Sequence, residues 1–426
     1  ELNSTLFSDY STKYRVIFLP PNGQGSVKPA IYQDKLSTGS VTESLNFPVG
    51  TVISKTFTFR TENASGGLLR EHVVETRLLI KRATATGDTW IGLPYMWDQG
   101  ADGKPTKAKL SLAGGNAAVQ WDYLDANPNV KKNGERARYT GSAANYAVPA
   151  ALNCITCHGG DDRVGTAPIG PKARNLDRNM KSDRSGENQL AFMARQGWLT
   201  GMPAARDAAL ATMDIPGSGP SKALPGSPRD VHERVRAYLE VNCMHCHNPN
   251  GGASNSGLSL DSFRKVDVRY GICKKPVAAG RGSGNLKHDI VLGQAASSIL
   301  NFRMGSAEAG VRMPPIARSV VHGEAAALIN EWVATGLPGI NSENDAEVEN
   351  ENSCNDSELP LLITELLPSE LTSVLAEIQR ASGGAISLTM VTDFLATITQ
   401  GASAAPSSPT QRSERARRLT PQPPLR

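Results

Sequence analysis

Two copies of the pattern Cys-x-x-Cys-His constrain this chain more than any other feature. The first is Cys-Ile-Thr-Cys-His at residues 154–158, and the second is Cys-Met-His-Cys-His at residues 243–247. The pattern is typical of covalent haem attachment, since two thiols one helical turn apart can bond both vinyl groups of one porphyrin while the histidine binds its iron. The sequence therefore predicts two c-type haems, held by Cys154, Cys157, His158, Cys243, Cys246 and His247.

Two other uses of paired cysteines fit this spacing less well. Zinc sites made of two Cys-x-x-Cys pairs have roughly 15–20 residues between the pairs. Here the pairs begin at positions 154 and 243, which are 89 apart. A thioredoxin-like dithiol would need a βαβ context, which the surrounding sequence does not show. Zinc binding and dithiol chemistry stay as alternatives to haem attachment.

The bulk properties of the chain limit its class. Its 426 residues are enough for about two to four domains. The net charge of +4 is too small to indicate nucleic-acid binding, and no run of 18 apolar residues predicts a membrane span. The chain begins at Glu1, and c-type haem is attached outside the cytoplasm. We therefore expect an exported, processed protein that is periplasmic, outer-membrane-associated or extracellular.

We predict an α+β multidomain fold with a β-rich, sandwich-like domain at residues 1–140. Val, Ile, Thr and aromatic residues concentrate there at 14–19, 51–60, 72–82 and 89–97. Two mostly α-helical, cytochrome c-like haem domains are expected at residues 141–220 and 221–340. Their predicted helices are 186–196, a helix that starts at Ser227 and runs into Cys243, and 322–335.

The remainder of the chain differs in composition. Residues 341–359 are acidic and are expected to form a solvated linker. Residues 360–400 contain an amphipathic pattern that predicts a short helical segment. Residues 401–426 are rich in Ser, Pro and Arg and are expected to be a disordered tail.

Six segments around the motifs share a further resemblance: residues 18–23, 47–51, 169–176, 235–249, 273–284 and 312–315. Together they resemble a largely uncharacterised family of exported bacterial diheme c-type cytochrome proteins. The resemblance covers about residues 12–337 and does not extend to the segment after 340. It implies two haem c groups and export, but no assigned activity.

His158 and His247 are the predicted proximal iron ligands. A proximal histidine normally donates its second ring N–H to an acceptor. Cytochrome c domains often use a carbonyl at a Gly-Pro pair, and Gly170-Pro171 resembles this arrangement for the first haem. The sequence names no acceptor for His247.

The sixth ligand of the second haem is predicted to be Met313. It lies in the loop Arg-Met-Pro-Pro just before the last predicted helix, an order that resembles cytochrome c domains. Met304 is the alternative. For the first haem we predict Met202, with Met193 and Met213 as further candidates. Other histidines could serve as ligands or be bystanders: His232, His245, His288 and His322.

Two cysteines, Cys273 and Cys354, lie outside the motifs. In an exported protein they could form a disulfide, or they could remain two buried thiols.

These observations predict a diheme c-type cytochrome that carries single electrons between exported redox partner proteins, with no catalytic residue. One alternative is a diheme peroxidase or oxidase with an open or labile sixth position at the first haem. Another is a haem-bearing subunit of an extracellular assembly. Such a subunit would self-assemble or dock through the N-terminal β domain or the C-terminal segment.

Overall fold

The computed structural model divides the chain into a compact unit, Glu1–Asn355, and a second unit, Asp356–Arg426. The linker, helical segment and tail predicted at 341–359, 360–400 and 401–426 lie outside the described residues, apart from Cys354. So do Met213 and the predicted helix start at Ser227. The described residues are 1–33, 45–85, 87–126, 128, 130–158, 168–180, 186–203, 228–262, 264, 266–277, 280–336 and 354.

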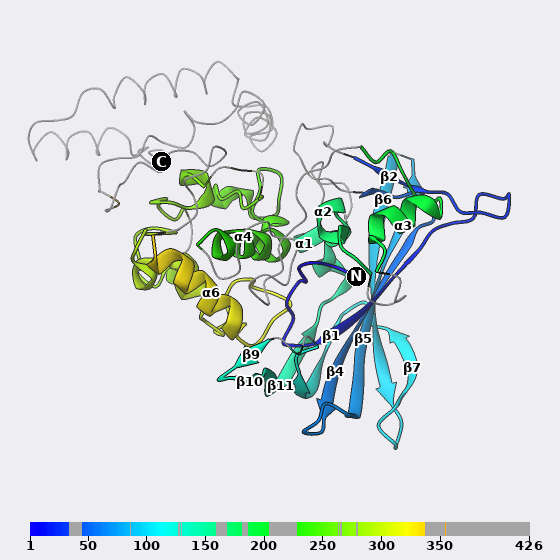
Figure 1. Ribbon diagram of the computed structural model, residues 1–426, viewed down its shortest axis with the longest axis horizontal. Helices are drawn as coiled ribbons and strands as arrows, with labels where there is room; N and C mark the ends of the chain where they lie inside the picture. The colour runs from blue at the N-terminus through cyan, green and yellow to red at the C-terminus, as the bar shows by residue number, and fades with distance from the viewer. Residues whose placement is uncertain are drawn as a thin grey trace, which may run out of the picture. The chain divides into compact units, whose positions relative to one another are not determined.

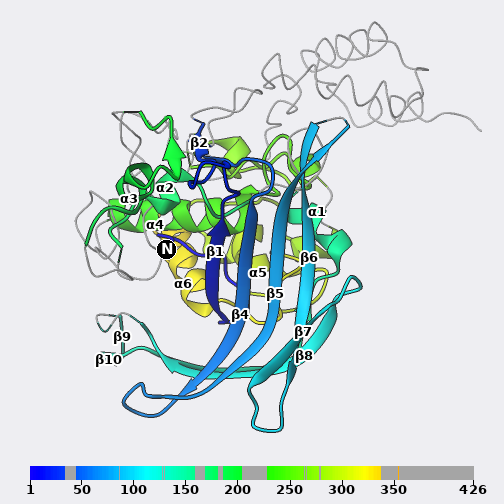
Figure 2. The same cartoon turned by 90° about the vertical axis from the view of Figure 1, so that its right-hand side faces the viewer.

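The first unit is built on one large sheet that curls along its length (Figures 1 and 2). Its strand order is β11-β8-β4-β5-β6-β7, and β1 pairs with β4. A single parallel bridge, Thr61 with Asp122, joins β4 to β8, and the other pairs are antiparallel. Among the described residues its seven strands are β1 (Thr12–Phe18), β4 (Val52–Glu62), β5 (Leu68–Thr84), β6 (Gly87–Gln99), β7 (Pro105–Leu110), β8 (Gly115–Leu124) and β11 (Arg138–Val148).

Shorter strands connect distant parts of the chain. β12 (Leu199–Thr200) pairs in parallel with β2 (Ala30–Tyr32), which also pairs with β3 (Leu45–Asn46). This pairing brings the segment that follows the first motif against the N-terminal part of the chain. β9 (Lys131–Lys132) and β10 (Glu135–Arg136) form a separate hairpin.

The helical elements are short and lie to one side of the large sheet (Figures 1 and 2). The α-helices are α1 (Cys154–His158), α2 (Ala173–Leu176), α3 (Gln189–Arg195), α4 (Pro228–Leu239), α5 (Ile299–Met304) and α6 (Gly323–Ala334). A π-helical turn, η2 (Glu240–Met244), continues α4, and the 3₁₀ turns are η1 (Ala151–Asn153), η3 (Ser254–Ser256), η4 (Val268–Tyr270), η5 (Gly280–Ser283) and η6 (Ala295–Ser297).

Local sequence signals explain where two of these helices begin and end. The Asn188 side chain accepts hydrogen bonds from the backbone N–H groups of Leu190 and Ala191 at 3.0 and 3.2 Å, which caps α3. Gly197 follows α3 with φ 70°, and Gly336 follows α6 with φ 75°. Both glycines adopt the left-handed conformation that ends many helices.

Two apolar clusters position the motif regions. One contains Val235, Cys243, Ile329 and Trp332 and holds α4, η2 and α6 together. The other packs Leu176 and Leu190, with neighbouring side chains of the first-motif region, against Ile17, Ile53 and Leu79 of the sheet. The sheet face that carries these three residues is therefore the face toward the helical elements.

The N-terminal segment, which precedes β1, is bonded to the region of the second motif. The backbone N–H of Phe7 donates to Asn242 Oδ1 at 2.8 Å, and the Tyr10 hydroxyl donates to Glu324 Oε2 at 2.6 Å. Asp9 accepts hydrogen bonds from the backbone N–H groups of Ser319 and Val320 at 2.7 and 3.0 Å. These bonds join segments more than 200 positions apart into one unit.

The predicted fold class is wrong. The four strand segments expected from alternation lie within β1, β4, β5 and β6, but they belong to one curled sheet rather than a sandwich. The two separate, mostly α-helical cytochrome c-like domains are not present either. The helix at the first motif, α1, is 5 residues long and directly follows η1 and the sheet strand β11, so within the described residues the first motif packs on the sheet and not in a helical core of its own.

Candidate haem or metal site

The first motif packs against the sheet. The last strand, β11, ends at Val148, and the chain turns through η1 into α1, which contains the whole motif. Cys154 lies over Gly92 of β6, where an added Cβ would come within 2.5 Å of Cys154 Sγ. The absence of a side chain at Gly92 therefore makes room for the first thiol of the motif.

The second motif lies where α4 passes into the π-helical turn η2. Cys243 is 9% exposed and belongs to the apolar cluster between α4 and α6, whereas Cys246 and His247 are half-buried. Single π-helical turns inside helices are frequent at functional sites. The wider turn changes which side chains face the core at the point where the motif begins.

The orientation of His247 is determined by Ser256. His247 Nδ1 lies 3.0 Å from Ser256 Oγ, and the Ser256 hydroxyl lies 2.7 Å from the carbonyl oxygen of Ala253. One arrangement satisfies both contacts: the Ser256 hydroxyl donates to the Ala253 carbonyl, and His247 donates its Nδ1–H to Ser256. That tautomer leaves the lone pair of Nε2 available for an iron. Burial lowers the pKa of His247 to about 4, so the ring is neutral at physiological pH.

The two motifs are in direct contact. Cys246 Sγ donates a hydrogen bond to the carbonyl of Thr156 at 3.3 Å. The backbone there is close as well, because a Cβ added at Gly252 would lie 3.0 Å from the Thr156 oxygen. Ligand atoms of Cys157, His245 and Cys246 lie within 4.8 Å of one another. The structure therefore brings residues of both motifs into one group.

The four motif thiols differ in their electrostatic surroundings. The neighbouring Cys246 thiol and His245 lower the pKa of Cys157 below its ordinary value. Burial raises the pKa of Cys154, and it raises the pKa of Cys243 to about 12. Since a thiolate is the form that binds metals, Cys157 is the motif thiol best suited to that role.

An ion-pair network joins the segment after the first motif to the helix of the second. Glu240, 2% exposed, lies 3.1 Å from Lys172 Nζ and 3.6 Å from Arg174. Lys172 Nζ also lies 3.5 Å from the Met244 sulfur. Burial alone would raise the pKa of Glu240, but the two cations and the Ser262 hydroxyl lower it to about 2. The network therefore holds the segment at 169–176 against the helical turn that carries the second motif.

The predicted sixth ligands lie in different surroundings. Met313 is half-buried, and its backbone N–H donates to the Arg303 carbonyl at 3.1 Å. The Arg303 charge is one of those that lower the pKa of His247, so this loop is fixed near the second motif. Met304 is 2% exposed and shares the apolar cluster of Cys243. Met202 and Met193 pack in the cluster between the sheet and α3.

The remaining candidates have structural contacts. Trp332 Nε1 donates to His232 Nδ1 at 3.1 Å, and His322 stacks on Phe7 with ring centroids 4.0 Å apart. His288 is 5% exposed. The carbonyl of Gly170, expected to orient His158, accepts from Lys172 N at 2.9 Å and Asn175 Nδ2 at 3.3 Å. Both lone pairs of that oxygen are therefore used within the segment at 169–176.

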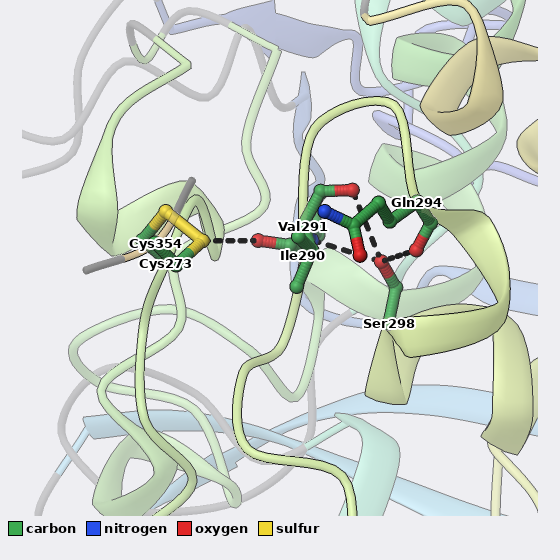
Figure 3. The surroundings of a disulfide bond; sticks show 6 residues. All are labelled: Cys273, Ile290, Val291, Gln294, Ser298 and Cys354. Atoms are coloured by element: carbon green, nitrogen blue, oxygen red, sulfur yellow. Dashed lines mark hydrogen bonds between the residues drawn. A yellow bond between two sulfur atoms is a disulfide. The ribbon is translucent and has the colours of Figure 1, made fainter. Parts of the chain in front are cut away.

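The two remaining cysteines form a disulfide, Cys273–Cys354 (Figure 3). Beside it, the Ser298 hydroxyl and backbone groups of Ile290 and Val291 connect the neighbouring segments, with Val291 N donating to Ser298 Oγ at 2.8 Å. The bond joins positions 81 apart in the sequence. The sequence left open either a disulfide or two buried thiols, and the structure contains the disulfide.

Comparison with protein-family models, curated proteins and solved structures finds no match to this chain. Over the part of the chain that is described, no helix is long and apolar enough to cross a membrane.

Sequence reasoning missed two residues that shape the site, Gly92 and Ser256. A glycine inside a strand signals a close approach by another segment, so Gly92 could have been noticed. Ser256 carries no comparable signal, because its role depends on how the loop after the second motif folds.

Proposed function

We propose that this protein is a diheme c-type electron carrier that works outside the cytoplasm. The observation that carries the proposal is that two complete Cys-x-x-Cys-His motifs, 89 positions apart, lie in contact within one folded unit. A c-type haem supplies a one-electron couple at its iron, and the protein tunes that couple through axial ligands, hydrogen bonds and burial.

The residues of the second motif would hold one haem. Cys243 and Cys246 would bind the porphyrin covalently, and His247 would offer Nε2 to the iron in the tautomer whose Nδ1–H is bonded to Ser256. The Ser256 bond fixes the tautomer and orientation of the ring, as acceptors beside metal-bound histidines do. Met313 is the proposed sixth ligand, on a loop whose backbone is bonded to α5.

The residues of the first motif would hold the other haem, which we call the first haem. His158 would be its proximal ligand, and Met202 is its proposed sixth ligand. Cys154 is set against the sheet at Gly92. The contact of Thr156 with Cys246 would place the two porphyrin attachment points beside each other. Such proximity suits the passage of an electron from one haem to the other.

A redox titration with a soluble mediator tests this proposal. The protein should be produced by export in a host with haem attachment machinery. We expect two one-electron transitions and haem colour that stays with the protein after acid-acetone extraction. A variant with Cys243→Ala and Cys246→Ala should retain only one transition. Protein without covalent haem after export would contradict the proposal.

A second candidate function is a metal site at the contact between the motifs. Cys157, His245 and Cys246 supply a thiolate-and-imidazole set that zinc prefers, and their ligand atoms lie within 4.8 Å of one another. His245 Nδ1 is buried with no hydrogen-bond partner among the described residues. Thioethers at Cys157 and Cys246 would remove both thiolates, so the two candidates exclude each other. Elemental analysis for zinc and iron on one preparation distinguishes them.

A further inference from the structure

Four basic side chains share the sheet face that packs against the first motif. Arg15 of β1 pairs with Lys55 of β4, which pairs with Arg77 of β5. Residues paired directly across strands lie on the same face, so the three form a row across the sheet. Lys13 is two positions before Arg15 and belongs to the next row on that face, opposite Phe57.

These cations gather around one aromatic ring. Lys13 Nζ and Lys55 Nζ each lie 5.5 Å from the centroid of the Phe57 ring, and the Arg77 guanidinium carbon lies 4.3 Å from it. Lys13, Lys55 and Arg77 are half-buried. Cations at this spacing repel one another, and partial burial strengthens the repulsion.

The cluster contains one carboxylate, Glu75, and its hydrogen bonds go to Arg77 and Tyr146. Glu75, fully buried, accepts two hydrogen bonds from Arg77 at 2.8 and 2.6 Å and one from the Tyr146 hydroxyl at 2.6 Å. No carboxylate of the described residues forms an ion pair with Lys13 or Lys55. Burial, with the charges of Arg15 and Arg77, lowers the pKa of Lys55 to about 7. Lys13 Nζ donates to the Ser11 carbonyl at 3.0 Å, and burial lowers the pKa of Lys13 as well. The cluster therefore has more basic groups than carboxylates, and a bound anion would favour the charged form of both lysines.

The basic cluster lies beside the first motif. The row next to Lys55 and Arg77 contains Leu79 and Gly92, and Cys154 lies over Gly92. Strands rise about 3.3 Å per residue, so the Arg77 row is about 7 Å, and the Lys13 row about 13 Å, from the Gly92 row. These two distances bracket the span of a porphyrin from its vinyl edge to its propionate edge.

We infer that Lys13, Lys55 and Arg77 form the binding site for the two propionate carboxylates of the haem attached at Cys154 and Cys157. The inference rests on the proposed function, because it needs that haem. The thioethers fix one edge of the porphyrin at the Gly92 row, and the cations two and four positions along the strands pair with the carboxylates of the opposite edge. Arg77 stays bonded to Glu75, so the two lysines provide most of the unpaired charge.

Lys55→Met and Lys13→Met test this inference, because methionine keeps the side-chain length and removes the charge. The readout is the midpoint potential of each haem. The transition that shifts in His247→Met is assigned to the second haem, and the other belongs to the first. A positive charge near the haem favours the reduced state, so each variant should shift the reduction equilibrium of the first haem toward the oxidised form by roughly three- to thirty-fold. Lys107→Met, at an exposed position of β7, is the matched control and should shift neither haem.

The outcomes separate the inference from the proposed function. If the exported protein carries no covalent haem, both the inference and the proposed function are wrong. If two haems are attached but the potential of the first haem is unchanged in Lys55→Met and Lys13→Met, only the inference is wrong. The site could instead bind a free anion, which is tested by adding inorganic phosphate to the wild-type protein. A phosphate-dependent shift of the first haem that is lost in Lys55→Met would overturn the assignment to propionates. No phosphate effect, together with the expected shift in both variants, supports it.

Discussion

Cys246 Sγ donates a hydrogen bond to the carbonyl oxygen of Thr156 at 3.3 Å. Each residue lies inside a Cys-x-x-Cys-His motif, so the contact makes the two motifs neighbours in space. Two haems attached there would lie close together, whereas a metal bound by Cys157, His245 and Cys246 would occupy the same contact. Both candidate functions therefore depend on this junction.

Ser256→Ala should raise the reduction potential of the second haem. The hydrogen bond from His247 Nδ1–H to Ser256 increases the basicity of the ring, which favours ferric iron. Its loss should raise the potential by on the order of tens of millivolts, with haem content unchanged. Ser297→Ala, on a 3₁₀ turn elsewhere, is the control. An unchanged potential in Ser256→Ala would mean that His247 is not the iron ligand.

Met313→Ala should remove the weak long-wavelength absorption band of a methionine-ligated ferric haem and lower the potential of that haem. A thioether ligand favours the reduced iron, so its loss favours the oxidised state. Met304→Ala should keep the band but destabilise the fold by roughly 2–5 kcal/mol, because Met304 is 2% exposed in the core. The reverse pattern, with the band lost only in Met304→Ala, would assign the ligand role to Met304.

Gly92→Ala should impair attachment of the first haem and leave the second intact. The new Cβ would lie 2.5 Å from Cys154 Sγ, so the thiol must move. Overpacking of this kind typically costs about 1–3 kcal/mol. Haem counting by mass and thermal unfolding measure the two effects. Full attachment of both haems with unchanged stability would show that Cys154 does not depend on this contact.

Glu240→Gln should destabilise the protein at neutral pH by on the order of 3 kcal/mol, since one pKa unit corresponds to about 1.4 kcal/mol. The folded-state pKa of Glu240, about 2, is below its ordinary value of 4.5. Its contribution is therefore complete above pH 4.5 and is lost as the pH falls toward 2. Denaturant unfolding between those pH values should show a smaller pH dependence in Glu240→Gln than in the exposed control Glu331→Gln. Equal pH dependence in both variants would rule out the Lys172–Glu240 network as a source of stability.

Local sequence patterns predicted elements better than architecture. The helix that ends at Gly336 was predicted at 322–335 and is α6, because periodicity and a terminal glycine are both local signals. The strands β7, β8 and β11 were missed. β11 runs through residue 140, the expected domain boundary, so the first motif begins directly from the sheet.

The contact between the motifs could not be predicted from the sequence. It depends on long-range bonds such as Phe7 to Asn242 and Lys172 to Glu240, which join segments far apart in the chain. The six proposed attachment residues could be named from the sequence because haem attachment requires a fixed local spacing, and their role stays a prediction. The acceptor for His247 was not found, because Ser256 reaches it only through the fold of the following loop.

The mass of the intact, denatured protein after export decides whether the two motifs carry haem. We expect a mass greater than that of the polypeptide by two haems, with no zinc retained under native conditions. The variant with Cys154→Ala and Cys157→Ala should lose one of these haems and keep the other. A polypeptide mass without haem, together with one zinc ion per chain in native spectra that is lost in Cys157→Ala, would contradict the account.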